Sequence, residues 1–570
     1  MSTLAFEGVE LCFANPGTSE LHLVAALDNV EGIRGVLVLF EGVATGAADG
    51  YGRMAGKPAS VLLHLGPGLA NGLANLHNAR RANSPVICLV GEQATYHRKY
   101  DPPLTMLQSI ESLVSSVSAE VLTIESAGEI TGSVVRAVRR TMGAGGAGRA
   151  DGNGAGQPGD ERPGARMLLP MQPGRVVSVV VPSDVSWGQV GRDRVSVAGD
   201  SAAGERTSGE AANMAGRAGA RPGSEAVRRS VGDERVEEVA SILRSGSPAA
   251  LLLGGEALRA TGIRNAVRIA ASTGAKVFAD VLPARMERGG SIPSVERLGY
   301  LPELALAQLQ GLSHLICVDV REPVSFFAYE GIPSSMAPDG CAVTHLAVWP
   351  HGAGATLAAL AEAVGGASSR SDATSVTVAA GVNGKASLPS GALDAGKLGA
   401  VFGALLPEGA IVVDEGVTEG IFAYLASEGA PEHDWLCLSG GAIGQGLPLA
   451  VGAALACTDR HVVALEADGS SMYTPQALWT QARESLNVTN IILSNRSYQL
   501  LRMELQRFGI DATRTEAEGL TSVGRPEIGF AKLASSFGIE STRVDDAGDF
   551  ATVLERYLKT EGPTLIEAVL

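Results

Sequence analysis

Cysteine is scarce in this chain, and its cysteines do not lie in pairs. Only six occur among 570 residues, none in a C-x-x-C arrangement, and most lie in apolar runs such as VICLV and LICVD. Zinc sites and disulfide frameworks need closely spaced or paired cysteines, so the sequence indicates neither. The pattern favours buried thiols in a protein of a reducing compartment.

Positive charge is also in deficit. The chain has 45 Lys and Arg against 61 Asp and Glu, which gives a net charge of −16. Binding to nucleic acid needs basic faces that neutralise phosphates, so this balance argues against a nucleic-acid partner. The charge balance does not exclude a small anionic substrate, because a local site on an acidic protein can still be basic.

Long apolar runs are missing as well. The longest candidate, residues 440–457, contains Pro448 and several glycines and is too short to cross a bilayer, so we expect a buried helix there. The first residues, MSTLAFEGVELCF, show neither a basic segment before a long apolar stretch nor an Arg-rich transit pattern. These absences predict a cytoplasmic protein without membrane contact.

The chain does contain many short apolar runs that alternate with helical stretches. Hydrophobic residues make up 45% and charged residues 19% of the sequence, which is typical of a soluble globular protein. Runs such as ASVLLHLG, AALLLGG and HVVALEAD are continuous rather than alternating. Continuous runs are typical of parallel strands buried on both faces. The predicted fold class is α/β, with three consecutive parallel-sheet domains.

Segments of low complexity divide the chain. Stretches rich in Gly, Ala and Ser cannot form a core, so they predict loops and linkers. The predicted order is a first domain over 1–187 with a Gly-rich insertion at 143–166, a linker over 188–232, a central domain over 233–366, a linker over 367–389 and a third domain over 390–570.

The third domain carries polar side chains at the ends of two predicted strands. Asp468 follows VVALEA, and Asn495 follows the next strand, IILS. Open α/β sheets bind ligands at the carboxyl ends of their parallel strands. A carboxylate and an amide oxygen there suit a Mg²⁺ ion that holds a phosphate group. An ordinary DG turn with a polar strand end is the alternative, because both occur in any α/β protein.

The first domain places a single acid in a similar position. Glu41 comes directly after the apolar run GVLVLF and begins a predicted helix rich in Gly and Ala. A carboxylate there is poorly solvated, which suits it to proton transfer. The alternative is an acid that merely complements the dipole of the helix.

Together these motifs resemble the thiamine-diphosphate (ThDP) enzymes. ADGSS and the later Ser494 and Asn495 are similar to that family's cofactor motif, GDG followed by NN, with Ala467 and Ser494 as small changes. NPGTSE, AADGYGRMAGKP and GPGLANGLANLHNA resemble the pyrimidine-binding domain, close to acetolactate synthases and benzoylformate decarboxylases. Phe40 stands where a His often precedes the catalytic Glu. The resemblance covers nearly the whole chain outside the Gly-rich segments.

The resemblance implies a role for each of several residues. Glu41 would exchange a proton with the aminopyrimidine ring, and His64 would act as an acid or base or else be structural. Asp468, Asn495 and the carbonyl of Ser497 would hold Mg²⁺. Further cofactor contacts would come from Val417, Thr418, the carbonyl of Gly441, the wedge Ile443, Gly469, Ser470 and Tyr498. Weaker candidates for the substrate pocket are Thr18, His97 and Arg502.

The activity implied by the resemblance is decarboxylation of a 2-oxo acid to an enamine on the cofactor, followed by ligation to a second carbonyl. A simple decarboxylase of the benzoylformate type and a non-catalytic paralogue are the alternatives. An NAD-dependent dehydrogenase ranks last, because no G-x-G-x-x-G turn follows a strand. The family also implies a homodimer or homotetramer with active sites shared between subunits. The sequence does not decide whether the central domain binds FAD, as it does in some relatives.

Overall fold

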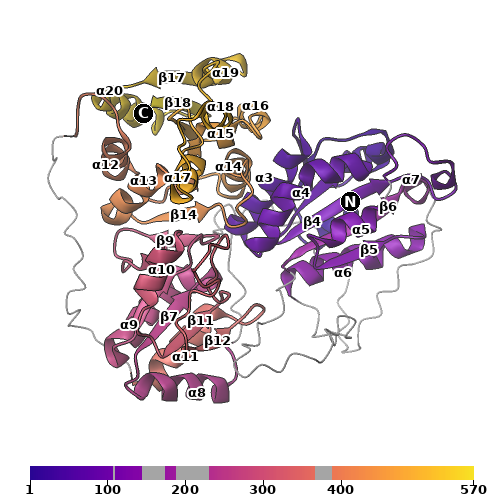
Figure 1. Ribbon diagram of the computed structural model, residues 1–570. Coiled ribbons are helices and arrows are strands. Elements are labelled where there is room, and N and C mark those ends of the chain that lie inside the picture. Colours follow the sequence, from indigo (N-terminus) through magenta and orange to yellow (C-terminus); the bar gives the residue numbers. More distant parts are fainter. Residues whose placement is uncertain (107–108, 144–173, 188–229, 366–387) are drawn as a thin grey trace, which may run out of the picture.

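The computed structural model describes residues 1–106, 109–143, 174–187, 230–365 and 388–570. They fold into three blocks, each built around a sheet with helices on its faces (Figure 1). The α/β class predicted from the continuous apolar runs is therefore confirmed. The Gly-rich insertion and both predicted linkers lie almost wholly outside the described residues. Within the described ranges, no helix is long and apolar enough to cross a membrane.

The first block contains a six-stranded parallel sheet in the order β2-β1-β3-β4-β6-β5. Its strands are β1 (Leu11–Ala14), β2 (Arg34–Leu37), β3 (Ala59–Leu63), β4 (Val86–Glu92), β5 (Glu120–Thr123) and β6 (Val176–Pro182). Its helices are α1 (Ser2–Phe6), α2 (Leu21–Leu27), α3 (Glu41–Ala55), α4 (Leu65–Arg81), α5 (Ile110–Ser115), α6 (Ile130–Met142) and α7 (Ser183–Trp187). Every residue of β3 and β6 is buried, as continuous apolar strands require.

The central block contains a five-stranded parallel sheet in the order β10-β8-β7-β11-β12. Its strands are β7 (Ala249–Leu253), β8 (Lys276–Ala279), β10 (Glu296–Arg297), β11 (His314–Val318) and β12 (Ala342–Ala347). Its helices are α8 (Asp233–Arg244), α9 (Ala260–Thr273), α10 (Pro302–Leu309) and α11 (Ala353–Ala363).

The third sheet has seven strands, in the order β17-β18-β16-β15-β13-β14-β9. Its strands are β13 (Ile411–Glu415), β14 (His433–Cys437), β15 (Val462–Ala467), β16 (Val488–Ser494), β17 (Glu540–Val544), β18 (Thr564–Val569) and, from the central block, β9 (Met286–Arg288). Its helices are α12 (Ala395–Leu405), α13 (Gly420–Ala426), α14 (Gly446–Ala456), α15 (Asp468–Ser471), α16 (Gln476–Arg483), α17 (Gln499–Arg507), α18 (Thr515–Thr521), α19 (Phe530–Ser536) and α20 (Ala547–Tyr557). The sheet was predicted to be parallel, but β9 pairs antiparallel with β14.

The first and third blocks share one hydrophobic core, because α3 packs directly against α14 (Figure 1). Glycines make this approach close. A Cβ atom on Gly50 would lie 2.1 Å from the carbonyl oxygen of Leu449, and one on Gly452 would lie 1.8 Å from that of Ala47. Only residues without a side chain permit such contact between two helix backbones. The packing brings the start of α3 to the loop that precedes α14.

A buried ion pair joins all three blocks. Arg53 donates to both carboxylate oxygens of Asp49, at 2.9 and 2.8 Å. The same guanidinium donates to the carbonyl oxygens of Cys437, in the third block, and Ala284, in the central block. Asp49 also accepts from the side chain of Gln445. Burying this pair is tolerable because each charge is hydrogen-bonded several times.

Candidate active site

Glu41 begins α3, as predicted, and the residue is 7% exposed. One oxygen accepts a hydrogen bond of 3.0 Å from the side-chain amide of Asn71, on α4. The Cα of Gly68 lies beside the other oxygen, and a Cβ there would be 2.9 Å from it. The structure therefore keeps this carboxylate away from bulk water with one described polar partner. The sequence had given Asn71 no role.

His64 precedes α4 and forms a pair with a fully buried acid. Its Nδ1 atom lies 2.7 Å from Glu20, whose carboxylate also accepts from the hydroxyl of Ser19 and the backbone N–H of Gly17. A carboxylate at Nδ1 fixes the orientation of an imidazole and leaves Nε2 as the nitrogen that can exchange a proton. Glu20 ends the NPGTSE motif, and it is a second residue whose role the sequence analysis missed.

Side chains of α4 hold the loop that carries Gly441 and Ile443. Asn78 donates to the carbonyl oxygen of Ala442 at 2.8 Å and accepts from its N–H at 3.2 Å. Asn75 donates both to the carbonyl of Gly42, next to Glu41, and to that of Gly444. Glu41 and the wedge loop are thus neighbours within one chain.

Asp468 lies at the carboxyl end of β15, at the edge predicted for the metal. Its oxygens accept from the backbone N–H groups of Gly469, at 2.7 Å, and Arg496, at 2.6 Å. Burial is the main cause that raises the pKa of Asp468 to about 6, despite these hydrogen bonds. The second bond ties this carboxylate to the segment after β16, so the structure brings Asp468 and the 495–497 segment together.

A further carboxylate, Glu419, lies at this edge. Asn495 donates from Nδ2 to Glu419 at 2.7 Å, and its Oδ1 accepts from the N–H of Ser497. The hydroxyl of Thr418 donates to the other oxygen of Glu419. Thr418, which the resemblance assigns to the cofactor, and Asn495, which it assigns to the metal, therefore both donate to an internal anion. The second Glu of DEGVTEG was the sequence signal for this residue.

Two buried acids lie side by side at the ends of two neighbouring strands. Glu415 and Glu466 are register partners on β13 and β15 and are 2% and 0% exposed. Burial raises the pKa of Glu415 to about 7, and burial beside Glu415 raises the pKa of Glu466 well above its usual range. Within the part of the chain that the structure describes, neither oxygen of Glu466 has a hydrogen-bond partner.

The chemistry of these residues fits Mg²⁺ and ThDP. The carboxylate of Asp468, the amide oxygen of Asn495 and the carbonyl of Ser497 belong to one sheet edge, and Mg²⁺ binds such oxygen ligands. A cation would also offset the charge of Glu419, which helps to raise the pKa of Asp468. Hydroxyl and amide donors at Thr418 and Asn495 suit a diphosphate.

The remaining predicted residues fall into two groups. Ser470 is buried, Val417 is exposed with φ +50°, and the ring of Tyr498 lies against Gly469. Thr18 and His97 are exposed, and Arg502 donates to the hydroxyl of Thr521. The structure connects none of these three to Glu41 or Asp468 through a described hydrogen bond, and their substrate role stays a prediction.

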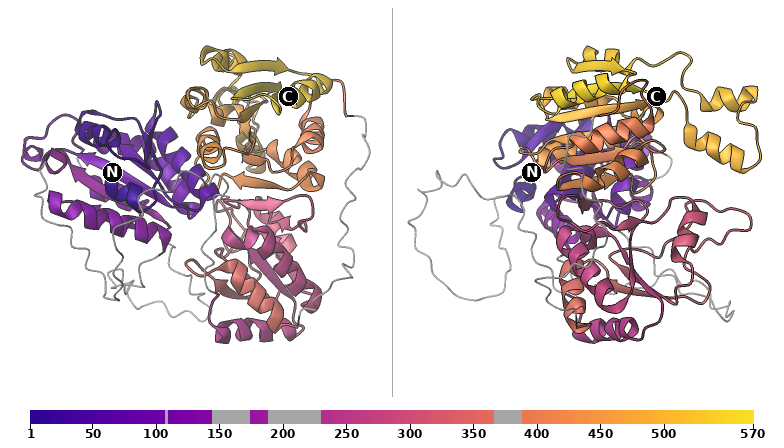
Figure 2. Two further views of the ribbon diagram at one scale, coloured as in Figure 1. Left: turned by 180° about the vertical axis from the view of Figure 1, so that it is seen from behind. Right: turned by 90° about the vertical axis from the view of Figure 1, so that its left-hand side faces the viewer.

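The central block also reaches the site. The ring of Phe326 lies over Gly441, 2.4 Å from where a Cβ would stand. Tyr329 donates to Glu504 on α17, which extends to one side of the third block (Figure 2). These contacts give the central block a part in lining the site.

The turn after β7 in the central block does not fit a dinucleotide phosphate. The N–H of Glu256 donates to a carboxylate oxygen of Asp319 at 2.8 Å, and that oxygen lies 2.1 Å from the position of a Cβ on Gly255. An anion already fills the place where a Gly-rich turn would meet a phosphate. This turn therefore gives no support for FAD.

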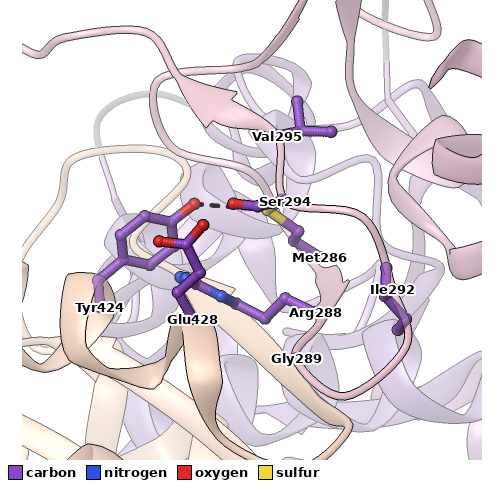
Figure 3. Close-up of a pocket in the computed structure, with 8 residues that line it drawn as sticks. All are labelled: Met286, Arg288, Gly289, Ile292, Ser294, Val295, Tyr424 and Glu428. Carbon is purple, nitrogen blue, oxygen red and sulfur yellow. Dashed lines mark hydrogen bonds between the residues drawn. The ribbon is translucent and has the colours of Figure 1, made fainter. Parts of the chain in front are cut away.

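A small cavity lies where β9 joins the third sheet (Figure 3). Its volume is about 10 Å³, which is room for a single water molecule. Arg288 lines it, with its guanidinium carbon 3.7 Å from the centre of the Tyr424 ring, and burial lowers the pKa of Arg288. The cavity is too small for a 2-oxo acid and belongs to the junction between blocks.

Comparison with known proteins gives the family. Residues 1–114 match the model of the thiamine pyrophosphate enzyme, N-terminal TPP binding domain, and residues 416–568 match that of the C-terminal TPP binding domain. A Mycobacterium tuberculosis protein named "Putative acetolactate synthase large subunit IlvX" is 45% identical over 100% of this chain and 98% of its own length. The chain belongs to the thiamine pyrophosphate enzyme family. Thiamine pyrophosphate is another name for ThDP.

Two further proteins resemble this chain at lower identity. A benzoylformate decarboxylase of Pseudomonas aeruginosa is 26% identical over 98% of this chain and 96% of its own length. Among solved structures, a 4-hydroxybenzoylformate decarboxylase of Rhodococcus jostii RHA1 matches with a TM-score of 0.73 and 24% identity, over 100% of this chain and 97% of that one. The second likeness shows the fold that the family shares.

Proposed function

We propose that this chain is a ThDP- and Mg²⁺-dependent enzyme that decarboxylates a 2-oxo acid and joins the remaining fragment to a second carbonyl, as acetolactate synthases do. The observation that carries the proposal is the hydrogen bonding of Asn75 to the carbonyls of both Gly42 and Gly444. It makes the acid Glu41 and the loop of Ile443 neighbours, which is the pairing that the cofactor's pyrimidine end needs.

Each block would have its own role in forming the active site. The first block, over 1–187, would bind the pyrimidine, and the third, over 390–570, would bind the diphosphate and Mg²⁺. The central block, over 233–366, lies between the two in the sequence and would line the site through Phe326. The enzyme would work in the cytoplasm as a homodimer or homotetramer.

The chain's own residues would bind the cofactor and move protons. ThDP supplies, when bound, an electron sink for the electron pair that CO₂ leaves behind. Glu41 would hold and exchange the proton at the pyrimidine nitrogen, and the carbonyl of Gly441 would accept from the amino group. His64, oriented by Glu20, would exchange a proton with the substrate through Nε2.

Residues of the third block would hold the other end of the cofactor. Asp468, Asn495 and the Ser497 carbonyl would bind Mg²⁺, while Thr418 and Ser470 would donate to the diphosphate. Gly469 would let the backbone approach it closely, with Tyr498 over the turn. Val417 and Ile443 would contact the cofactor with their apolar side chains. Thr418 would have to leave Glu419 for this binding, whereas Asn495 would bind the metal through Oδ1 and could keep its Nδ2 donation to Glu419.

Ligation is placed ahead of simple decarboxylation because the 45%-identical relative carries an acetolactate synthase name over its full length. The decarboxylases resemble this chain at lower identity. The distinction depends on what the pocket admits after CO₂ has left, and both reactions would use the same Glu41, Asp468 and Asn495.

The test is incubation of the purified protein with ThDP, Mg²⁺ and pyruvate, and separately with benzoylformate. CO₂ and acetolactate from pyruvate are the expected products. Acetaldehyde or benzaldehyde without a ligated product would instead identify a simple decarboxylase. Absence of CO₂ from a range of 2-oxo acids would contradict both reactions and leave a non-catalytic paralogue. Asp468→Ala protein, treated identically, controls for contaminating activity.

A further inference from the structure

Glu415 makes hydrogen bonds for which the reaction, as derived above, has no use. We propose that Glu415 is a positioning residue, which holds the loop over 440–446 in the conformation that presents the Gly441 carbonyl and the Ile443 side chain to the cofactor. The expected effect on cofactor binding rests on the proposed function. The expected effect on the loop does not, because it concerns the chain alone.

The hydrogen bonds of Glu415 span the end of this loop. One carboxylate oxygen accepts from the N–H of Gly444 at 2.6 Å, and the other accepts from the N–H of Gly446 at 2.5 Å. Glu415 is 2% exposed and ends β13, so its backbone is fixed by a central strand of the third sheet. Both partners are backbone N–H groups, and their hydrogen bonds to Glu415 strengthen when this carboxyl is ionised.

The geometry of the loop explains why it needs such an anchor. Gly441 and Gly444 have φ of +79° and +89°, which few other residues adopt. Glycine is also the residue that loses most conformational freedom on folding, so a loop with several glycines does not hold one shape by itself. A rigid acceptor at its end selects one conformation.

The loop is held from the opposite side by the first block. Asn78 pairs with both backbone groups of Ala442, and His77 lies 3.1 Å from the carbonyl oxygen of Gly440. Ile443 thus lies between a clamp on residues 440–442 and the Glu415 clamp on Gly444 and Gly446. The α4 side holds residues 440–442 and the carbonyl of Gly444, and the β13 side holds the N–H groups of Gly444 and Gly446.

Glu415→Gln tests the inference, because it keeps the volume but removes one of the two acceptor oxygens. In the cofactor-free protein, amide hydrogen exchange over 440–446 should become at least about tenfold faster than in the wild type. Calorimetric titration with ThDP and Mg²⁺ should show an affinity about tenfold weaker, the scale typical of residues that orient ligands.

The matched control is Glu567→Gln. Glu567 is also a buried acid of the third sheet, three strands away from Glu415, and accepts a backbone N–H from Ala531. Glu567→Gln should leave amide hydrogen exchange over 440–446 and the affinity for ThDP unchanged. If Glu415→Gln does not fold, Glu415→Asp is measured in the same way, since its shorter side chain cannot reach both amides.

Wild-type exchange over 440–446 in the Glu415 variant would overturn the inference. Faster exchange with unchanged ThDP affinity would also overturn it, because the loop would then not be positioned for the cofactor. A wild-type protein that fails to bind ThDP would instead contradict the proposed function. The exchange measurement would still decide whether Glu415 holds the loop.

Discussion

At the scale of single residues, the site depends on how completely each buried acid is hydrogen-bonded. Glu20 accepts from a hydroxyl and a backbone N–H and pairs with His64. Asp468 accepts from two backbone N–H groups. Among the described residues, the carboxylate of Glu41 accepts only from Asn71. Of these three acids, Glu41 has the fewest hydrogen-bond donors around it, while Glu20 is better suited to hold another residue in place.

The pair of Glu20 and His64 gives the first prediction. Glu20→Gln should lower kcat by about 10- to 100-fold and His64→Ala by about 100-fold or more, because general acid–base groups contribute on this scale. The double variant should be no slower than His64→Ala alone, since both changes disable one unit. Steady-state kinetics of the three variants provides the measurement. Effects that simply multiply would show that the two residues act independently.

The raised pKa of Asp468 predicts a pH dependence. Burial raises this pKa to about 6 in the metal-free protein, so the carboxylate is charged above that pH and takes up a proton as the pH falls through it. Since Mg²⁺ binds only the charged form, its apparent affinity should fall up to about tenfold per pH unit below 6. Titrating Mg²⁺ in the presence of ThDP between pH 5 and 8 measures this. An affinity that stays constant down to pH 5 would contradict the assignment.

Some of the site could be predicted from the sequence and some could not. Glu41, Asp468 and Asn495 follow apolar runs, and strand ends of one sheet meet at one edge. Glu20, Asn78 and Glu415 act through partners 44, 364 and 29 positions away. Nothing in local periodicity shows such contacts, because they depend on how the blocks pack.

At the scale of elements, the contact between α3 and α14 fixes the position of Glu41 relative to the wedge loop. Both helices are lined with small residues where they touch, and Gly452 lies against the backbone of α3. A side chain at this point would force the helix axes apart. The shared core of the first and third blocks would then lose contacts on both sides.

Gly452→Ala should therefore destabilise the protein by about 1–3 kcal/mol, which is the usual cost of overpacking a core. The control is Gly132→Ala, in α6, where a Cβ would have nothing within 4 Å. That change should be neutral or stabilising by up to about 1 kcal/mol, because alanine favours helices. Urea unfolding followed by circular dichroism compares the two. Equal stability of both variants would contradict the close packing of α3 on α14.

Most elements were predictable because they obey local patterns. Continuous apolar runs identified strands such as β3, β7 and β15, and α8 follows an amphipathic repeat. β5 was missed because its residues are only partly buried, and β9 because its three residues form a strand by pairing with β14. Pairing across blocks leaves no mark in local sequence.

At the scale of the whole molecule, several apolar side chains in and next to α13 and after α15 are exposed. Val417, Phe422, Leu425 and Tyr473 are 42%, 44%, 60% and 54% exposed. Apolar groups gathered on one surface are typical of an interface with another protein. A second copy of the chain would cover them, which is the assembly that the family resemblance implies.

A mixing experiment tests whether copies share active sites. Glu41→Gln and Asp468→Ala should each be inactive, but mixed dimers with shared sites would contain one intact site, so activity should return to about a quarter of the wild type. Light scattering confirms the assembly, and each variant mixed with itself is the control. No recovery in proven mixed dimers would show that each site is built from one chain, which the contacts of Asn75 also allow.

The central claim is that Glu41 activates ThDP bound at the edge of Asp468 and Asn495. The most direct measurement is the rate at which the protein exchanges the C2 hydrogen of bound ThDP for deuterium, with Mg²⁺ present. Glu41→Gln should slow this exchange by about 100-fold or more, while the Kd for ThDP changes by less than about threefold. An exchange rate in the Glu41→Gln protein equal to that of the wild type would contradict the account.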